Sequence, residues 1–507
     1  MTTARPDAAS HASASVAPPE QLALLRRQLE QLTGEVQAEA QARLSRWQPW
    51  LKRASYLPSA ENLAHYLALR SHDVRDLQSE LVTWGVSSLG RCEPYVLPNL
   101  RATQAALSAL AQAPEWPERT AFAALESRLS AHTHDLFGDG TTPGIMVTFP
   151  SEAAQNGELV TDLLRAGMTV ARINLAHDGP EEWLAMLRHL EQAREATGKP
   201  CRVLMDLAGP KVRTGEPQWP DDPERLRVGD VLALGAQEDT LPHDLPGVTC
   251  TLPAALHQVR PGAEVWFDDG KFGTVVEAVE GDWLRLKLTH APLKGAKLKA
   301  EKGINFPDTA LDLPALTDKD REDVQFVARH ADLVGYSFVQ TVGDVAALLD
   351  ALKAAGAPER LGIVLKIETR LAVQNFTDLM VRAAGERPCG VMIARGDLAV
   401  ELGFARLAEI QEEVLWLAEA AHLPVIWATQ VLEGLVKKGQ RERGEFTDAA
   451  GGVRAECIML NKGPYVVDGV RELSTIIGRM RPHFDKKRPQ FRALSVAQST
   501  DDQPAGE

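Results

Sequence analysis

The side chains of this sequence that could carry chemistry follow short apolar runs of the chain. Charged or polar residues stand at the ends of five such runs: Arg172, Asn174, Asp206, Lys211, Arg213, Lys366, Glu368, Arg395, Asp397, Thr429 and Gln430. Carboxylates among several cations suit a divalent metal, because Mg²⁺ prefers a few carboxylates together with substrate phosphate and water. The cations would neutralise charge on a transferring phosphoryl group. The alternative interpretation is a ring of salt bridges that closes the end of the fold.

Eight apolar runs must position these residues, and they alternate with amphipathic segments. The runs are Gly144–Phe149, Val170–Asn174, Arg202–Leu207, Asp332–Phe338, Gly362–Glu368, Gly390–Ala394, Pro424–Gln430 and Glu456–Leu460. Continuous apolar strands separated by helices indicate parallel β/α units that are buried on both faces. Thr317 and Asp320 fit a capping box at the start of one helix. Eight units favour a closed (β/α)8 TIM barrel over an open doubly wound sheet, and the working residues of such barrels lie at the carboxyl ends of the strands.

The stretch 218–299 interrupts this alternation of strands and helices. It has β-type segments bounded by Pro and Gly and no good helix pattern, which indicates a β-rich insertion. Without it, the barrel has close to the roughly 250 residues typical of the eight-fold fold. We therefore predict an α/β protein with a barrel over 141–217 and 300–482 and an inserted β-rich domain over 218–299.

The residues before the barrel differ from it in composition and in the spacing of their apolar residues. Residues 1–20 are rich in Ala, Ser and Pro and predict a disordered tail, and a second tail is expected over 483–507. Apolar residues at helical spacing predict a helical N-terminal domain over 21–140. They include Leu22, Leu24, Leu25, Leu29, Leu32, Leu63, Tyr66, Leu67 and Leu69. The histidines of this region are scattered, so surface or capping roles are favoured over a metal site.

Composition narrows the class of protein further. The 507 residues carry a net charge of −14, which disfavours a general affinity for nucleic acid or for an anionic membrane. No apolar run approaches the roughly 18 residues that span a bilayer. The five cysteines lie far apart, so neither a disulfide framework nor a CxxC metal site is indicated. These features predict a cytoplasmic protein.

Eight short motifs, in order along the chain, resemble those of the pyruvate kinase family. They are Ala171–His177, Met205–Gly215, Lys302–Pro307, Leu313–Thr317, Ser337–Val339, Lys366–Glu368, Ala394–Leu398 and Ala428–Gln430. The resemblance runs from about Gly144 to Met480 and includes an insertion where the family has its mobile lid domain. Each motif alone is short, but eight in register are specific.

The resemblance implies phosphoryl transfer between phosphoenolpyruvate and ADP, giving pyruvate and ATP in glycolysis. Carried over by position, Glu368 and Asp397 would hold the divalent metal, Mg²⁺ or Mn²⁺. Lys366 would stabilise the phosphoryl group during transfer, and Arg172 would contact the same phosphate. A lysine suits this role because its ammonium is a compact point charge.

Other implied roles concern the substrate carboxylate and the nucleotide. The backbone N–H groups of Gly396 and Asp397 would bind the carboxylate together with Thr429, since they open a helix. Thr429 would also help to deliver a proton to the enolate carbon. The residues that would face the nucleotide are Asn174, His177, Arg213 and Lys302.

Lys211 stands where potassium-dependent members of the family carry a glutamate. Of the family's potassium ligands Asn174 and Asp206 remain, whereas Ala176 and Leu207 replace a serine and a threonine. An ammonium tethered at Lys211 can supply the charge that K⁺ would bring. The resemblance therefore implies that potassium is not required. The alternative is that Lys211 points to solvent at the hinge of the lid.

Three segments depart from the family pattern. The chain reads Asn461-Lys462-Gly463-Pro464 where the family has a longer Ser-Gly-Glu-Thr-Ala-Lys-Gly loop near the nucleotide, and Thr148–Ser151 and Gly439–Arg443 also differ. No regulatory C-terminal domain of the family's kind follows the barrel, so we expect no activation by sugar phosphates. The alternatives to an active pyruvate kinase are a barrel that uses another nucleotide or phosphodonor and a non-catalytic regulatory paralogue. The resemblance allows a homodimer through the barrel.

Overall fold

The computed structural model of the chain describes residues 18–84, 86–87, 89–110, 120–138, 143–220, 225–481, 484–485 and 488–489. Residues 1–17 of the predicted tail 1–20 and most of the predicted tail 483–507 lie outside the described residues, whereas residues 18–20 begin a helix instead of continuing the tail. The chain divides into two compact units, one formed by 1–46 and 58–127 and the other by 47–57 and 128–507. We describe each unit by itself.

The first unit is built of helices, as the spacing of its apolar residues predicts. Its helices are α1 (Pro18–Trp47), α2 (Leu57–Arg70), α3 (Arg75–Thr83), α4 (Val96–Leu110) and the first part of α5 (Thr120–Phe137). Leu25, Leu29 and Val36 are buried on one face of α1, because residues four and seven apart share a side of a helix. Leu24, predicted for the same face, is 49% exposed since it lies one residue off that stripe.

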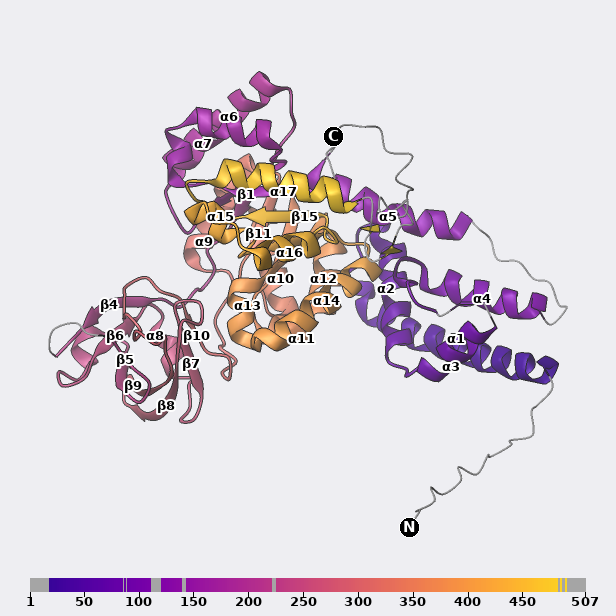
Figure 1. Cartoon of the computed structure of the whole chain (residues 1–507), viewed down its shortest axis with the longest axis horizontal. Helices are drawn as coiled ribbons and strands as arrows, with labels where there is room; N and C mark the ends of the chain where they lie inside the picture. Colours follow the sequence, from indigo (N-terminus) through magenta and orange to yellow (C-terminus); the bar gives the residue numbers. More distant parts are fainter. Residues whose placement is uncertain are drawn as a thin grey trace, which may run out of the picture. The chain divides into compact units, whose positions relative to one another are not determined.

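The second unit contains a closed barrel of eight parallel strands, which confirms the predicted TIM-barrel fold and excludes the open sheet (Figure 1). Around the barrel the strand order is β1-β15-β14-β13-β12-β11-β3-β2. The strands are β1 (Gly144–Thr148), β2 (Val170–Asn174), β3 (Arg202–Asp206), β11 (Leu333–Tyr336), β12 (Gly362–Ile367), β13 (Cys389–Ala394), β14 (Val425–Ala428) and β15 (Cys457–Leu460). Almost every residue in them is buried, which explains their continuous apolar sequence.

Helices follow the strands and cover the outside of the barrel. They are α6 (Gly157–Ala166), α7 (Pro180–Thr197), α9 (Asp318–His330), α10 (Val342–Ala354), α11 (Arg370–Gln374), α12 (Phe376–Ala384), α13 (Arg395–Leu402), α14 (Phe404–Ala420), α15 (Glu433–Lys438), α16 (Arg443–Gly452) and α17 (Val466–Met480). The predicted capping box of α9 is confirmed: the Asp320 N–H donates to Thr317 Oγ1 at 3.1 Å, and the Thr317 N–H donates to Asp320 Oδ2 at 3.0 Å. After α17 the short strands β16 (Phe484–Asp485) and β17 (Arg488–Pro489) pair with each other.

The end of α5 fills the amino end of the barrel. Leu136 and Phe137 belong to the same buried cluster as the inward-facing residues of the barrel strands. Gly362 and Gly390 make room for Leu136, because a Cβ at either position would lie within 2.6 Å of its side chain. The part of the chain that precedes β1 is therefore built into the barrel core.

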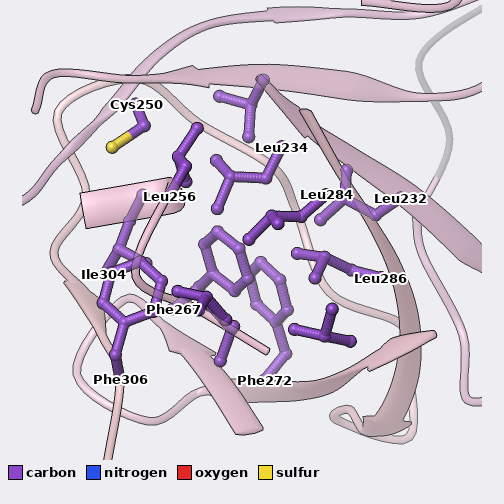
Figure 2. Close-up of a cluster of buried hydrophobic side chains, with 14 of the residues drawn as sticks. Leu232, Leu234, Cys250, Leu256, Phe267, Phe272, Leu284, Leu286, Ile304 and Phe306 are labelled. Atoms are coloured by element: carbon purple, nitrogen blue, oxygen red, sulfur yellow. The ribbon is translucent and has the colours of Figure 1, made fainter. Parts of the chain in front are cut away.

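The inserted segment between β3 and α9 forms a second sheet, as predicted. Its strands are β4 (Thr214–Gln218), β5 (Val231–Gly235), β6 (Gly247–Cys250), β7 (Glu264–Phe267), β8 (Phe272–Glu280), β9 (Trp283–His290) and β10 (Ile304–Asn305), with the one-turn helix α8 (Pro253–Leu256). The strand order in this sheet is β10-β7-β8-β9-β5-β6-β4. The sheet has a hydrophobic core of its own. In that core the rings of Phe267 and Phe272 stack at 4.8 Å among leucines from β5 and β9 (Figure 2).

Among the residues that the structure describes, no helix is long and apolar enough to cross a membrane. All five cysteines are buried free thiols, in line with the absence of a disulfide pattern in the sequence.

We predict that Leu136→Ala destabilises the barrel unit by about 2–5 kcal/mol, because it leaves a cavity where the barrel cannot collapse. The measurement is urea-induced unfolding followed by tryptophan fluorescence. Leu184→Ala is the matched control, since Leu184 on α7 is 40% exposed and should change the unfolding free energy by well under about 1 kcal/mol. Equal effects of the two substitutions would contradict the assigned role of Leu136.

Candidate active site

A polar cavity of about 150 Å³ opens at the carboxyl ends of the barrel strands. Eight of the eleven residues predicted for the site line it: Arg172, Asn174, Lys211, Arg213, Lys366, Glu368, Asp397 and Thr429. Gly396, His177 and Lys302 are not among the lining residues. Because these side chains come from five different β/α units, only closure of the barrel brings them together.

Four charged side chains form a buried cluster at the base of this cavity. The Lys366 ammonium lies 3.3 Å from Asp206 Oδ2 and 3.0 Å from Glu368 Oε1, and it donates to Ser337 Oγ at 2.7 Å. Arg172 donates to Asp206 Oδ2 through Nε at 3.0 Å and through Nη2. Lys366, Glu368 and Asp206 are 8%, 3% and 1% exposed. The cluster thus consists of two cations and two carboxylates in mutual contact.

This arrangement sets the protonation of the cluster. Burial by itself would raise the pKa of Asp206, but Lys366 and Arg172 hold it below its usual value. Burial opposes the charge of Lys366, yet the neighbouring Asp206 and Glu368 raise its pKa. For Glu368, burial raises the pKa and nearby Asp397 adds to the rise, against the effect of Lys366. A cation placed between Glu368 and Asp397 would relieve this repulsion.

Two carboxylates therefore face the cavity in a way that suits a hard divalent cation. Among the residues that the structure describes, no group of three or more His, Cys, Asp and Glu side chains could hold a metal ion. A metal on Glu368 and Asp397 would complete its coordination with substrate oxygens and water, as Mg²⁺ commonly does. The residues present fit such an ion, with one competing contact. The Lys211 ammonium already lies 2.9 Å from Asp397 Oδ1 and 3.0 Å from Oδ2.

Lys211 is placed by the loop that follows β3. The N–H groups of Ala208 and Gly209 donate to Asp320 Oδ1 at 3.0 and 3.3 Å, which fastens this loop to the first turn of α9. The Lys211 side chain is 22% exposed and does not point into solvent. Burial opposes its charge, but Asp397 raises its pKa above the usual value. The structure thus brings Lys211 to Asp397. Elsewhere in the cavity lining, the Ala176 N–H donates to Asn174 Oδ1 at 3.1 Å.

The end of β14 and the start of α13 are joined through Thr429. The Gly396 N–H donates to Thr429 Oγ1 at 2.7 Å, so the hydroxyl sits on the amino end of α13. Arg395 donates to the carbonyls of Ala428 and Thr429 at 2.9 and 2.6 Å and stacks 4.6 Å above the Trp427 ring. Thr429 has φ +62°, a left-handed value that costs a threonine about 1–3 kcal/mol. Arg395 holds this strained backbone in place.

A group of cations lies on the other side of the cavity, near β2. Burial lowers the pKa of His177, and Lys462 and Arg213 lower it further, which places both cations near the imidazole. Lys302, on the inserted domain, lies 3.7 Å from Asp268 Oδ1. Asn461 lines the cavity directly after β15. Of the residues that the sequence assigned to the nucleotide, Asn174 and Arg213 line the cavity, whereas His177 and Lys302 do not.

A second cavity of about 310 Å³ lies beside the first, between the inserted domain and α11. The two cavities share Lys211, Phe338 and Asp397 as lining residues. Asn305 donates to Asp397 Oδ1 at 3.5 Å, and its own Oδ1 finds no hydrogen-bond partner in the described part of the chain. Glu401 lines this cavity as well. The Lys211–Asp397 pair therefore stands between the two spaces.

Sequence reasoning gave no role to several residues of this site. Ser337 and Asn305 lie within two of the eight family motifs. Their residue types did not indicate that Ser337 contacts Lys366 or that Asn305 contacts Asp397. Glu401 follows Asp397 by one helical turn, a spacing that places two residues on one face and could have suggested it. Lys462 follows the eighth strand, so its position alone was a signal.

Comparison with known proteins agrees with the fold. Residues 142–468 match the family model "Pyruvate kinase, barrel domain". The pyruvate kinase of Mycobacterium tuberculosis (strain ATCC 25618 / H37Rv) is 32% identical over 349 residues, which are 66% of this chain and 70% of that protein. That of Bacillus licheniformis is 29% identical over 69% of this chain and 59% of its own length, and pyruvate kinase PKLR of Rattus norvegicus is 29% identical over 63% and 56%.

The fold and site define a TIM barrel with a cluster of buried charges at the carboxyl ends of its strands. The chain belongs to the pyruvate kinase family.

We predict that Glu401 makes the stability of the protein fall as pH rises. Burial raises its pKa from 4.5 to about 7. The neutral form therefore stabilises the fold below about pH 4.5, and this contribution is lost as pH rises through about 7. Glu401→Gln should remove the loss, so the variant should gain up to about 3 kcal/mol relative to the unmodified chain between pH 5 and 8. Urea unfolding in metal-free buffer measures this.

The control for this measurement is Glu238→Gln, which changes an exposed glutamate of the inserted domain. It should leave the pH profile unchanged. If the profiles of Glu401→Gln and the unmodified chain stay parallel, the carboxyl is not held neutral by its surroundings.

Proposed function

We propose that this chain catalyses the pyruvate kinase reaction, the transfer of a phosphoryl group from phosphoenolpyruvate to ADP. The observation that carries the proposal is the buried Lys366 ammonium, held at 3.0 Å from Glu368 and 3.3 Å from Asp206. A protein that only bound ligands would have no need of such a charge at the point of phosphoryl transfer. Membership of the family supports the same assignment.

The residues of the site would divide the reaction between them. Arg172 and Lys366 would hold the phosphate and neutralise the charge that spreads over its oxygens while the P–O bond to the enol oxygen breaks and a bond to ADP forms. Glu368 and Asp397 would hold a divalent cation, Mg²⁺ or Mn²⁺, which when bound would supply positive charge against the anionic oxygens of the substrates. Hydrogen bonds fix Arg172, Lys366 and Glu368 in advance.

The remaining steps concern the carboxylate and the proton. The N–H groups of Gly396 and Asp397 at the start of α13 would bind the substrate carboxylate, since a helix N-terminus favours anions. Thr429 Oγ1 accepts from the Gly396 N–H at 2.7 Å, which leaves the hydroxyl proton free to be donated, and Thr429 would help to deliver a proton to the enolate carbon. Asn174, His177, Arg213 and Lys302 would bind the nucleotide phosphates, together with Lys462.

The decisive experiment is a lactate-dehydrogenase-coupled assay of the full chain with phosphoenolpyruvate, Mg²⁺ and a panel of nucleoside diphosphates. We expect pyruvate formation with at least ADP. Pyruvate with another nucleoside diphosphate and none with ADP would favour the alternative with a changed acceptor, for which the short Asn461–Pro464 connection after β15 is the supporting observation. No pyruvate with any acceptor would leave a different phosphodonor or a regulatory role.

We predict that Lys366→Met lowers kcat and kcat/KM together by at least about a hundredfold. The reason is that its charge acts mainly on the transition state, so its loss removes one preorganised electrostatic contact. Steady-state kinetics at saturating Mg²⁺ measure the effect. Lys353→Met, on the outer helix α10, is the control and should keep normal kinetics. A rise in KM alone would make Lys366 a substrate anchor instead.

We also predict that full activity persists when K⁺ is replaced by a bulky tetraalkylammonium ion at equal ionic strength. The tethered charge of Lys211 stands among carboxylates near the cavity, whereas Ala176 offers no hydroxyl ligand for K⁺. Lys211→Glu should lose activity sharply under the same conditions. A strong potassium requirement of the unmodified chain contradicts the prediction.

The cytoplasmic location and the barrel-to-barrel homodimer remain predictions from sequence.

A further inference from the structure

Lys211 and Asp397 form a contact that uses both oxygens of the carboxylate. The ammonium lies 2.9 Å from Oδ1 and 3.0 Å from Oδ2. Asn305 adds a donor to Oδ1 at 3.5 Å. Asp397 therefore has little room for a further electropositive partner while this contact persists.

The same oxygens are the ones that a divalent cation would need. Under the proposed function, on which this inference rests, Asp397 and Glu368 hold that cation. Two cations within bonding distance of one carboxylate repel each other strongly, and the repulsion is weakly screened in a site this buried. Lys211 and the metal ion therefore compete for the two carboxylate oxygens of Asp397.

The Lys211 side chain has another carboxylate within reach. Its Cε and Asp269 Oδ1 lie 3.0 and 3.9 Å from the point where a Cβ on Gly303 would stand, so Asp269 lies on the path that the flexible lysine side chain can sweep. Asp269 belongs to the turn between β7 and β8 of the inserted domain and contributes to the raised pKa of Lys211. The loop that carries Lys211 is fastened to α9 through Asp320, so the long side chain alone can change partner.

We propose that Lys211 is a tethered competitor of the divalent metal at Asp397. It weakens metal binding to the free protein, and it yields Asp397 for Asp269 when the metal arrives with the substrate phosphate. Metal occupancy is thereby tied to substrate, and the change of partner links the metal site to a turn of the inserted domain. A permanent structural ion pair between Lys211 and Asp397 is the alternative that the experiment must exclude.

The experiment measures Mn²⁺ binding to the full chain without substrate, from the electron paramagnetic resonance signal of free Mn²⁺. Lys211→Met removes the charge and keeps the length of the side chain, and it should tighten Mn²⁺ binding by at least about tenfold. The matched control is Lys271→Met, which removes a lysine of the inserted domain that pairs with Asp268 at 2.7 Å. It should leave the affinity within about twofold of the unmodified chain. Circular dichroism checks that each variant is folded.

A second measurement needs no substitution. Lys211 in the unmodified chain is labelled with a lysine-acylating reagent and quantified by mass spectrometry, with and without saturating Mn²⁺. Displacement by the metal should change the labelling of Lys211, because Lys211 exchanges its contact with both oxygens of Asp397 for Asp269, and it should leave the labelling of Lys271 unchanged. Unchanged labelling of Lys211 would show that Lys211 keeps its contact with Asp397 and would overturn the proposal, even if Lys211→Met did not fold.

The outcomes separate this inference from the proposed function. Equal or weaker Mn²⁺ binding by Lys211→Met overturns the inference alone, provided that Glu368→Gln abolishes binding. Mn²⁺ binding by none of the proteins overturns the metal site, and with it both the inference and the proposed function. Tighter binding by Lys211→Met in a chain that makes no pyruvate would support the inference and contradict the proposed reaction.

Discussion

The pairing of buried charges around Lys366 is the constraint on which the rest of this structure depends. An ammonium removed from water is tolerated only when opposite charges and hydrogen-bond partners surround it. Asp206, Glu368 and the Ser337 hydroxyl meet that requirement within 3.3 Å. These groups come from β3, β11 and β12, so the cluster exists only where the three strands lie side by side in fixed register.

The surrounding structure keeps the strand ends from relaxing. Asp320 at the start of α9 holds the loop after β3, and Arg395 holds the left-handed backbone at Thr429. Phe338 also has a positive φ, and its N–H is fixed by Glu368 Oε2 at 2.7 Å. Strain and buried charge both cost stability, and the apolar barrel core, which Leu136 completes at the opposite end, offsets that cost.

Asp397 is the point where the barrel and the inserted domain meet in the site. It opens α13, and it receives Lys211 from the connection into the inserted domain and Asn305 from the strand that leads back out of it. The inserted domain has a separate core around Phe267 and Phe272. The polar contacts at Asp397 connect this domain to the carboxylate that opens α13.

The sequence by itself determined the barrel and the inserted sheet, and most of the site residues that it predicted line the cavity, because continuous apolar strands and polar residues at their ends are periodic, local signals. It could not determine which charges pair, since the contact of Lys211 with Asp397 joins residues far apart in the chain. Helical spacing misplaced Leu24, because one residue off the stripe is enough to reach solvent. The pairing partners, the raised pKa of Glu401 and the strained Thr429 were decided by the tertiary structure, because burial and mutual distance exist only once the barrel has closed.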